Sequence, residues 1–222
     1  MKGLRYIFWN LPGPFTQDKR ERIFPILKRF NADFILLCET HLSGNHVLNQ
    51  NPAQVLARCW DDDALPDDDL LDRTSWWSTN DNNTWDTRCC GTAILMRPGL
   101  DVKVLKVEHR QDGRGSSILF QHNNGEQESL HAVYVPAGDA NARSAFLDQL
   151  NFDYTAFPNP RIAGDWQIFL DPALDAAAAP GAPPRTAHAA LPAMRRMLQR
   201  NSLIDIFRVL NPTTQAMTHS SN

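Results

Sequence analysis

Short apolar segments that stop abruptly at a polar residue constrain the fold of this chain more than any other feature. The apolar run Phe34–Cys38 stops at Glu39, and a second short run ending at Ala163 is followed by Gly164 and Asp165. Apolar runs of this length, without a helical period, favour strands buried in a sheet. We therefore expect an α/β protein, with a very short strand at 162–163 lying in the interior of its sheet.

Four predicted strands end in a polar group, at Asn10, Glu39, Tyr134 and Asp165. Gln167 follows Asp165 at a spacing of two, which in an extended backbone places both side chains on one face. A carboxylate and an amide aimed together can hold a reacting phosphate or water. Taken singly, each residue has an ordinary explanation as a turn residue, a solvated strand end or a packed tyrosine. Four such strand ends in one chain predict a single site.

The rest of the pattern alternates between strands and helices. Pro25 lies inside the first helical pattern and predicts either a kink or a late start. Short turns between the strands from 91 to 135 favour an antiparallel meander. The expected strands are 4–9, 34–38, 75–78, 91–96, 102–107, 116–121, 129–135 and 162–163, with a possible strand at 213–220; the expected helices are 16–31, 139–150, 189–199 and 203–208.

Length and composition indicate an ordinary globular protein. The 222 residues suffice for one sizeable hydrophobic interior, and 42% hydrophobic with 21% charged residues is a common balance. A net charge of -3 provides no general basic field for nucleic acid, although a bound metal could supply positive charge locally. The apolar runs are too short to span a bilayer, so no membrane association is expected.

The cysteines and an acidic segment have structural explanations. Cys38, Cys59, Cys89 and Cys90 show no C-x-x-C spacing, and no secretory leader precedes them. We expect reduced, structural thiols in an intracellular protein, nuclear or cytoplasmic. The acidic segment 61–69 lacks the alternating ligands and the glycine of a calcium loop, so a solvated insertion is the better interpretation, and its role stays open.

A set of short segments also follows a characteristic order along the chain. They are Phe8-Trp9-Asn10, Leu36-Leu37-Cys38-Glu39-Thr40-His41, Gly91-Thr92-Ala93-Ile94-Leu95, Val133-Tyr134-Val135-Pro136, Arg143 with Phe146, Gly164-Asp165-Trp166-Gln167, Leu203-Ile204-Asp205-Ile206-Phe207-Arg208 and Leu210-Asn211-Pro212-Thr213. In this order the chain resembles the endonuclease/exonuclease/phosphatase superfamily, in particular the AP-endonuclease-like domain of LINE-type retrotransposons. The resemblance runs from about residue 4 to residue 222.

The resemblance implies a fold and a function. The fold would be a four-layer α/β (α+β) sandwich, two packed mixed β-sheets flanked by helices, in a single domain over 1–222. The function would be metal-dependent phosphodiester hydrolysis, with DNA as the substrate. Glu39 and Asn10 would hold the metal, and magnesium suits their oxygen ligands, with manganese as a second possibility.

The resemblance also assigns roles to four further positions. Asp165 would position or activate the attacking water, and Tyr134 would contact the scissile phosphate. Gln167 stands where the family usually has a catalytic Asn, one methylene closer to the backbone. Thr218 would help to bind the substrate backbone.

The C-terminus departs from the family pattern. The family closes with a Ser-Arg-Ile-Asp stretch and then Ser-Asp-His, whereas this sequence ends at Ser220-Ser221-Asn222. His219 lies in the possible strand with Thr218 and lacks a following Asp. We therefore expect the last strands of one sheet to be missing and the enzyme to be inactive or weakly active.

Three interpretations stay open at this point. The first is an enzyme of this superfamily, as a fragment or a decayed copy. The second is a catalytically inactive domain kept for binding nucleic acid or protein, and the third is a retrotransposon remnant without a selected function. Glu39 favours recent descent from an active enzyme, whereas Gln167 and the missing closing motif favour decay. The pattern predicts neither the target preference nor the oligomeric state.

Overall fold

The computed structural model describes residues 3–11, 17–41, 75–78, 90–175 and 188–214. The chain forms two compact units. The first unit comprises Met1–Tyr134 and Asp153–Asp165, and the second comprises Val135–Phe152 and Trp166–Asn222. The expectation of a single domain over 1–222 stays a prediction.

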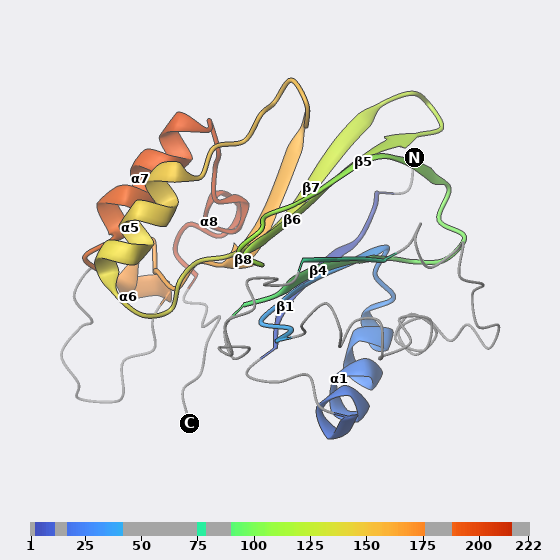
Figure 1. The fold of residues 1–222 in the computed structure, drawn as a ribbon, viewed down its shortest axis with the longest axis horizontal. Coiled ribbons are helices and arrows are strands. Elements are labelled where there is room, and N and C mark those ends of the chain that lie inside the picture. The colour runs from blue at the N-terminus through green and yellow to red at the C-terminus, as the bar shows by residue number, and fades with distance from the viewer. Residues whose placement is uncertain (1–2, 12–16, 42–74, 79–89, 176–187, 215–222) are drawn as a thin grey trace. The chain divides into compact units, whose positions relative to one another are not determined.

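The first sheet belongs to the first unit and is mixed. Its strands lie in the order β1-β2-β4-β3. β1 runs parallel to β2, whereas β4 runs antiparallel to both β2 and β3 (Figure 1). The four strands are β1 (Tyr6–Asn10), β2 (Phe34–Cys38), β3 (Ser75–Ser78) and β4 (Thr92–Met96), all close to their predicted bounds.

The second sheet of the first unit is also mixed, with the order β5-β6-β7-β8. The antiparallel meander predicted from the short turns is present in β5, β6 and β7. β8 then runs parallel to β7, with Tyr134 opposite Asp165 at their carboxyl ends. The strands are β5 (Val102–His109), β6 (Gly115–His122), β7 (Gln127–Tyr134) and β8 (Pro160–Asp165).

The predicted interior position of the strand at 162–163 is wrong. β8 is the last strand of its sheet, and among the described strands it pairs only with β7. It begins with Pro160, which has no N–H for a ladder, and the Arg161 side chain is 56% exposed. Proline at a strand start and an exposed charge both suit an edge better than an interior position.

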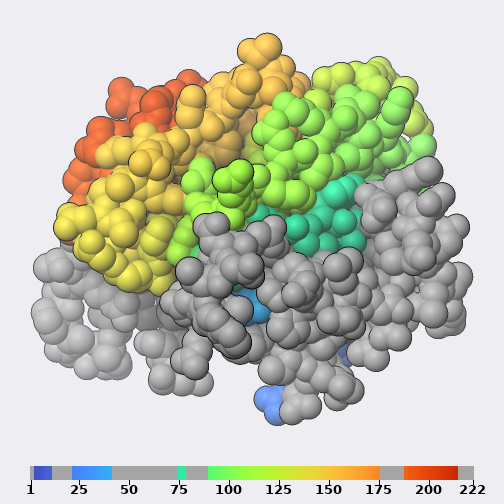
Figure 2. All heavy atoms as spheres, viewed as in Figure 1, coloured from blue at the N-terminus to red at the C-terminus, as the bar shows by residue number. Residues whose placement is uncertain are grey.

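The two sheets pack face to face through one apolar layer. The rings of Phe34 from β2 and Phe120 from β6 lie 5.0 Å apart between their centroids. In the space-filling view β3 (teal) borders the strands of the second sheet (green), in keeping with its contacts to β5 and β6 (Figure 2). Both sheets contribute side chains to this layer, namely Phe34, Leu36, Trp76, Ile94, Met96, Ile118, Phe120, Leu130 and Ala132.

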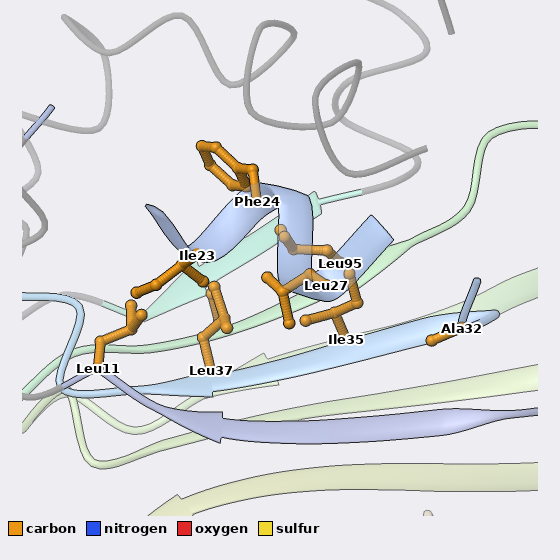
Figure 3. Packing of buried hydrophobic residues seen from close by; sticks show 9 residues of the cluster. Leu11, Ile23, Phe24, Leu27, Ala32, Ile35, Leu37 and Leu95 are labelled. Carbon is orange, nitrogen blue, oxygen red and sulfur yellow. The ribbon is translucent and has the colours of Figure 1, made fainter. Parts of the chain in front are cut away.

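Helix α1 (Gln17–Phe30) covers the other face of the first sheet. Figure 3 shows apolar side chains of α1, β2 and β4 meeting at this contact; those labelled include Ile23, Leu27, Ile35, Leu37 and Leu95. Pro25 lies inside the helix, which nevertheless starts at Gln17, so the alternative of a late start is wrong. Asn31, with φ 45°, ends the helix in the left-handed conformation that is common at helix C-termini.

The second unit contains α5 (Ala140–Gln149), α6 (Pro172–Asp175), α7 (Leu191–Arg200) and α8 (Ile206–Leu210). Asp139 and Asp205 cap α5 and α8 by accepting hydrogen bonds from backbone N–H groups. The buried amide of Asn201 accepts a bond from Phe152 N–H and donates to the Leu150 carbonyl, which ties the end of α7 to the chain after α5. No helix in the described ranges is long and apolar enough to cross a membrane.

Candidate active site

The carboxyl ends of strands from both sheets of the first unit meet at one place. Asn10 ends β1, Glu39 directly follows β2, and Asp165 ends β8. The Asn10 amide nitrogen Nδ2 donates to Glu39 Oε1 at 3.1 Å and to Asp165 Oδ2 at 2.6 Å. One amide therefore joins two carboxylates that come from strands 126 residues apart in the sequence (165 − 39).

This arrangement fits a divalent cation. Two carboxylates that share one neutral donor repel each other, and a positive charge between them relieves that repulsion. The Asn10 carbonyl oxygen Oδ1 is buried and has no hydrogen-bond partner among the described residues. Leaving such an oxygen unpaired costs on the order of 1–3 kcal/mol, which coordination would offset. The described residues contain no group of three or more His, Cys, Asp or Glu that could hold a metal. Amide oxygen is a further ligand type that magnesium and calcium accept.

The Tyr134 hydroxyl belongs to the same cluster. Burial raises the pKa of Tyr134, and the negative charge of Glu39 and a hydrogen bond to it raise the pKa further. The Arg114 guanidinium lies 5.2 Å from the centroid of the Tyr134 ring and opposes this shift without reversing it. Tyr134 is therefore protonated at neutral pH and can act as a hydrogen-bond donor.

An irregular backbone fixes the position of Glu39. Both Glu39 and His41 are left-handed, with φ 56° and φ 50°. Thr40 N–H donates to the Gly91 carbonyl at 3.1 Å, and a Cβ on Gly91 would lie 2.2 Å from Thr40 Oγ1. Left-handed non-glycine residues cost on the order of 1–3 kcal/mol each and are concentrated at functional sites. The segment after β2 is thus held in a costly conformation that directs Glu39 toward Asn10.

Gly164 serves the packing of β8 rather than a turn or a ligand contact. A Cβ at this position would lie 2.3 Å from the Val133 carbonyl oxygen, so only glycine lets β8 lie this close to β7. Behind it, the Cys38 thiol donates to the same carbonyl at 3.3 Å. Burial, and after it the negative charges of Asp165 and Glu39, raises the pKa of Cys38. The thiol therefore stays protonated and unreactive, and its role is in packing.

For the remaining predicted site residues, the structure contradicts one argument and leaves other positions outside the described ranges. Gln167 has φ 54°, so the extended backbone assumed for a shared face with Asp165 does not continue, and that argument is wrong. Gln167 also belongs to the second unit, whereas Asp165 belongs to the first. Thr218, the acidic segment 61–69 and most of the possible strand 213–220 lie outside the described residues. The catalytic and metal-binding roles of Asn10, Glu39, Tyr134 and Asp165 stay predictions.

Two residues near the site were missed by sequence reasoning. His41 Nε2 lies 3.6 Å from Glu39 Oε2, with only 9% of its side chain exposed. Its spacing of two from Glu39 was the available signal. Arg114 was not detectable, because its guanidinium lies over a ring twenty positions further along the chain (134 − 114).

Arg143 belongs to the segments that carry the family resemblance. It is buried and holds part of the second unit in place. Its guanidinium donates to the carbonyl oxygens of Pro136 at 2.8 Å and Gly138 at 2.9 Å, and it contacts His188. Burial and the Arg143 charge lower the pKa of His188, which keeps its imidazole neutral. These bonds hold the turn between β7 and α5.

Solved structures of AP endonucleases share this fold. The enzyme LMAP from Leishmania major is 17% identical, with a TM-score of 0.61 over 96% of this chain and 71% of that chain. An AP endonuclease from Archaeoglobus fulgidus is 15% identical, with a TM-score of 0.65 over 99% and 79%. The APE2 catalytic domain from Xenopus laevis is 15% identical, with a TM-score of 0.60 over 94% and 73%.

These likenesses establish the fold of the chain. No protein-family model and no curated protein matches the sequence. The fold is a mixed α/β fold of the AP endonuclease type, built on two packed mixed β-sheets with helices, as the sequence predicts.

Proposed function

We propose that this chain is a metal-dependent phosphodiester hydrolase of the endonuclease/exonuclease/phosphatase superfamily that acts on DNA. The observation that carries the proposal is the Asn10 amide, which donates to Glu39 and Asp165 while its own carbonyl oxygen stays buried and unpaired. The AP endonuclease names of the structures that share the fold support DNA as the substrate.

Each residue of the cluster has a distinct role in this proposal. Glu39 and the Asn10 carbonyl oxygen hold the cation. When bound, that cation stabilises negative charge on the phosphate and on the leaving oxygen. The Asn10 N–H group orients the Asp165 carboxylate, which accepts a proton from the attacking water.

The phosphate would be held by the other side of the cluster. Tyr134 stays protonated and donates its hydroxyl hydrogen to a phosphate oxygen. The Arg114 guanidinium over the Tyr134 ring adds a fixed positive charge beside that hydroxyl. Nη1 of Arg114 is buried without a hydrogen-bond partner among the described residues, so its N–H groups can donate to an anionic oxygen.

A plasmid-nicking assay with magnesium or manganese tests the proposal. Asp165→Asn and Glu39→Gln keep side-chain size and remove the charge, and each is expected to lower nicking by about 10²–10⁴-fold. Asp148→Asn is the matched control, because Asp148 lies on α5 of the second unit and, among the residues that the structure describes, pairs only with exposed Arg196. Nicking that survives Asp165→Asn would contradict the hydrolase proposal. DNA binding without any nicking would favour the inactive binding domain.

The proposal extends to origin and activity level. The ordered motifs support an origin in a LINE-type retrotransposon, and the buried Cys38 thiol, which donates to the Val133 carbonyl, supports an intracellular site of action. We infer low activity from Gln167, whose amide is one methylene further from the backbone than the family's Asn. A misplacement of about 1 Å can cost on the order of 10² in rate, so Gln167→Asn should raise nicking.

A further inference from the structure

We propose that His41 is a third ligand of the cation site, and that the site therefore prefers manganese to magnesium. This inference rests on the proposed function, because it uses the same cation between Glu39 and Asn10. It adds a nitrogen donor to a site that otherwise offers only carboxylate and amide oxygen.

His41 differs from the other described histidines in the hydrogen bonding of its ring nitrogens. Both of its ring nitrogens are buried and neither has a hydrogen-bond partner among the described residues. His131, which is more deeply buried, bonds Ser117 through Nδ1 at 2.8 Å and Ser129 through Nε2 at 3.2 Å. Each ring nitrogen of an imidazole carries either a lone pair or an N–H group, and a buried one needs a partner. A buried ring in which neither nitrogen has a hydrogen bond therefore suggests an additional ligand.

The position of His41 makes the cation the natural partner. Its backbone is fixed by the bond from His41 N–H to the Cys90 carbonyl at 3.0 Å, and its Nε2 lies 3.6 Å from Glu39 Oε2. That separation is too long for a hydrogen bond but matches two ligands on one ion, each about 2.1 Å from it. The Asn10 amide donates through Nδ2 to the same carboxylate at 3.1 Å, and its own carbonyl oxygen is buried without a hydrogen-bond partner among the described residues. The proposed set is therefore one carboxylate, one imidazole and one amide oxygen.

This donor set selects among divalent cations. Magnesium takes oxygen ligands almost exclusively. Manganese also suits oxygen ligands, but as a first-row transition metal it accepts imidazole nitrogen too, and affinity for a mixed nitrogen and oxygen site rises along the series that begins with manganese. Asp165 is left out of the set, which keeps its carboxylate for the attacking water. The preference for manganese should amount to about tenfold in affinity, the lower range of what one such interaction contributes.

Calorimetric titrations of the full chain with Mn²⁺ and with Mg²⁺ test the preference, and pulsed EPR of the Mn²⁺-loaded chain tests the ligand directly. We expect ¹⁴N coupling to the manganese in the wild-type chain. His41→Gln should abolish that coupling and weaken Mn²⁺ binding about tenfold, with Mg²⁺ binding changed less than about threefold. His122→Gln is the matched control, because His122 Nε2 also lies 3.5 Å from a glutamate, Glu128, and it should change neither affinity.

The outcomes separate the two proposals. Manganese bound without ¹⁴N coupling, in a chain where Glu39→Gln abolishes binding, would overturn the role of His41 and leave the proposed function standing. Binding unaffected by Glu39→Gln would overturn the cation site itself. Should His41→Gln fail to fold, the EPR measurement on the wild-type chain still decides.

Discussion

The strands β1, β7 and β8 carry a polar cluster at each end, and the two clusters differ in how their charges are balanced. The carboxyl-end cluster consists of Asn10, Glu39, Tyr134 and Asp165. The amino-end cluster consists of Tyr6, Glu128, Arg161 and His122. β1, β7 and β8 each supply one residue to either cluster, whereas Glu39 follows β2 and His122 ends β6.

The amino-end cluster is electrostatically complete. Glu128 accepts hydrogen bonds from Arg161 Nε at 2.9 Å, Arg161 Nη2 at 3.1 Å and the Tyr6 hydroxyl at 2.9 Å. Burial raises the pKa of Glu128, but the bonds from Arg161 and Tyr6 and the nearby positive charges outweigh it and lower the pKa overall. A fixed guanidinium neutralises this carboxylate, so the cluster needs no ligand.

The carboxyl-end cluster lacks such a cation on Glu39. Among the described residues, Glu39 pairs with no Lys or Arg and meets only an amide, a hydroxyl and the His41 imidazole. A second carboxylate, Asp165, shares its amide donor. The comparison shows that a buried glutamate with similar polar neighbours is structural when an arginine neutralises its charge. It becomes a candidate metal ligand when none does.

The largest expected effect contrasts the two ends of β1. Asn10→Ala removes the donor shared by both carboxylates and one ligand oxygen, so DNA nicking should fall by at least about 10²-fold. Tyr6→Phe, at the other end of the same strand, should leave nicking within about threefold. Equal losses in both variants, measured at equal folded fraction by circular dichroism, would erase the functional distinction between the clusters.

The second-largest effect is a loss of stability, and it concerns the amino-end cluster. Arg161→Met leaves Glu128 mostly buried without its cation, which should lower the unfolding free energy by about 1–2 kcal/mol, less than a fully buried pair because Arg161 is half exposed. Glu39→Gln removes repulsion between carboxylates and should leave metal-free stability unchanged or slightly higher. Urea unfolding in EDTA measures both. A larger loss for Glu39→Gln than for Arg161→Met would invert the comparison.

Metal binding should raise the stability of the folded chain through the carboxyl-end cluster only. If Mn²⁺ binds with a dissociation constant of about 1 mM, then 10 mM Mn²⁺ adds roughly 1.4 kcal/mol of stability. Thermal unfolding should show this gain in the wild-type chain and in Arg161→Met, and EDTA should reverse it. Glu39→Gln should show no gain; a gain that persists there would place the metal elsewhere.

The smallest effect is a pH dependence of the amino-end cluster. Because the folded pKa of Glu128 lies below its ordinary value of 4.5, its stabilising contribution is fully present above about pH 4.5. That contribution is lost as the pH falls through the depressed folded pKa. The stability difference between wild type and Glu128→Gln should therefore be constant from pH 7 to pH 5 and shrink at pH 4 and below in urea titrations. A difference that grows on acidification would contradict the assignment.

Much of this fold could be predicted because its strands are short apolar runs. Phe34–Cys38 and Ser75–Ser78 match their predicted bounds, since a polar residue or a turn signal marks each end. Four site residues could be found for the same reason, because each ends or directly follows such a strand. The prediction for 162–163 failed because burial was inferred from two residues without weighing Pro160 and Arg161.

What could not be predicted depends on contacts between distant parts of the chain. The bond from Tyr6 to Glu128 spans 122 positions, and no local pattern indicates it. The left-handed backbone at Glu39 and Gln167 was equally hidden, since neither residue type favours that conformation. The failed argument for Gln167 follows directly from this, because it assumed an extended chain beyond Asp165.

The placement of the two clusters at opposite ends of the same strands has a consequence for the history of the gene. In a lineage released from selection on the proposed hydrolysis, changes at Glu128 or Arg161 would still lower stability, whereas Asn10 and Asp165 would be free to drift. Stability and chemistry can thus be lost at different rates, even though β1, β7 and β8 supply residues to both clusters. This chain keeps both clusters.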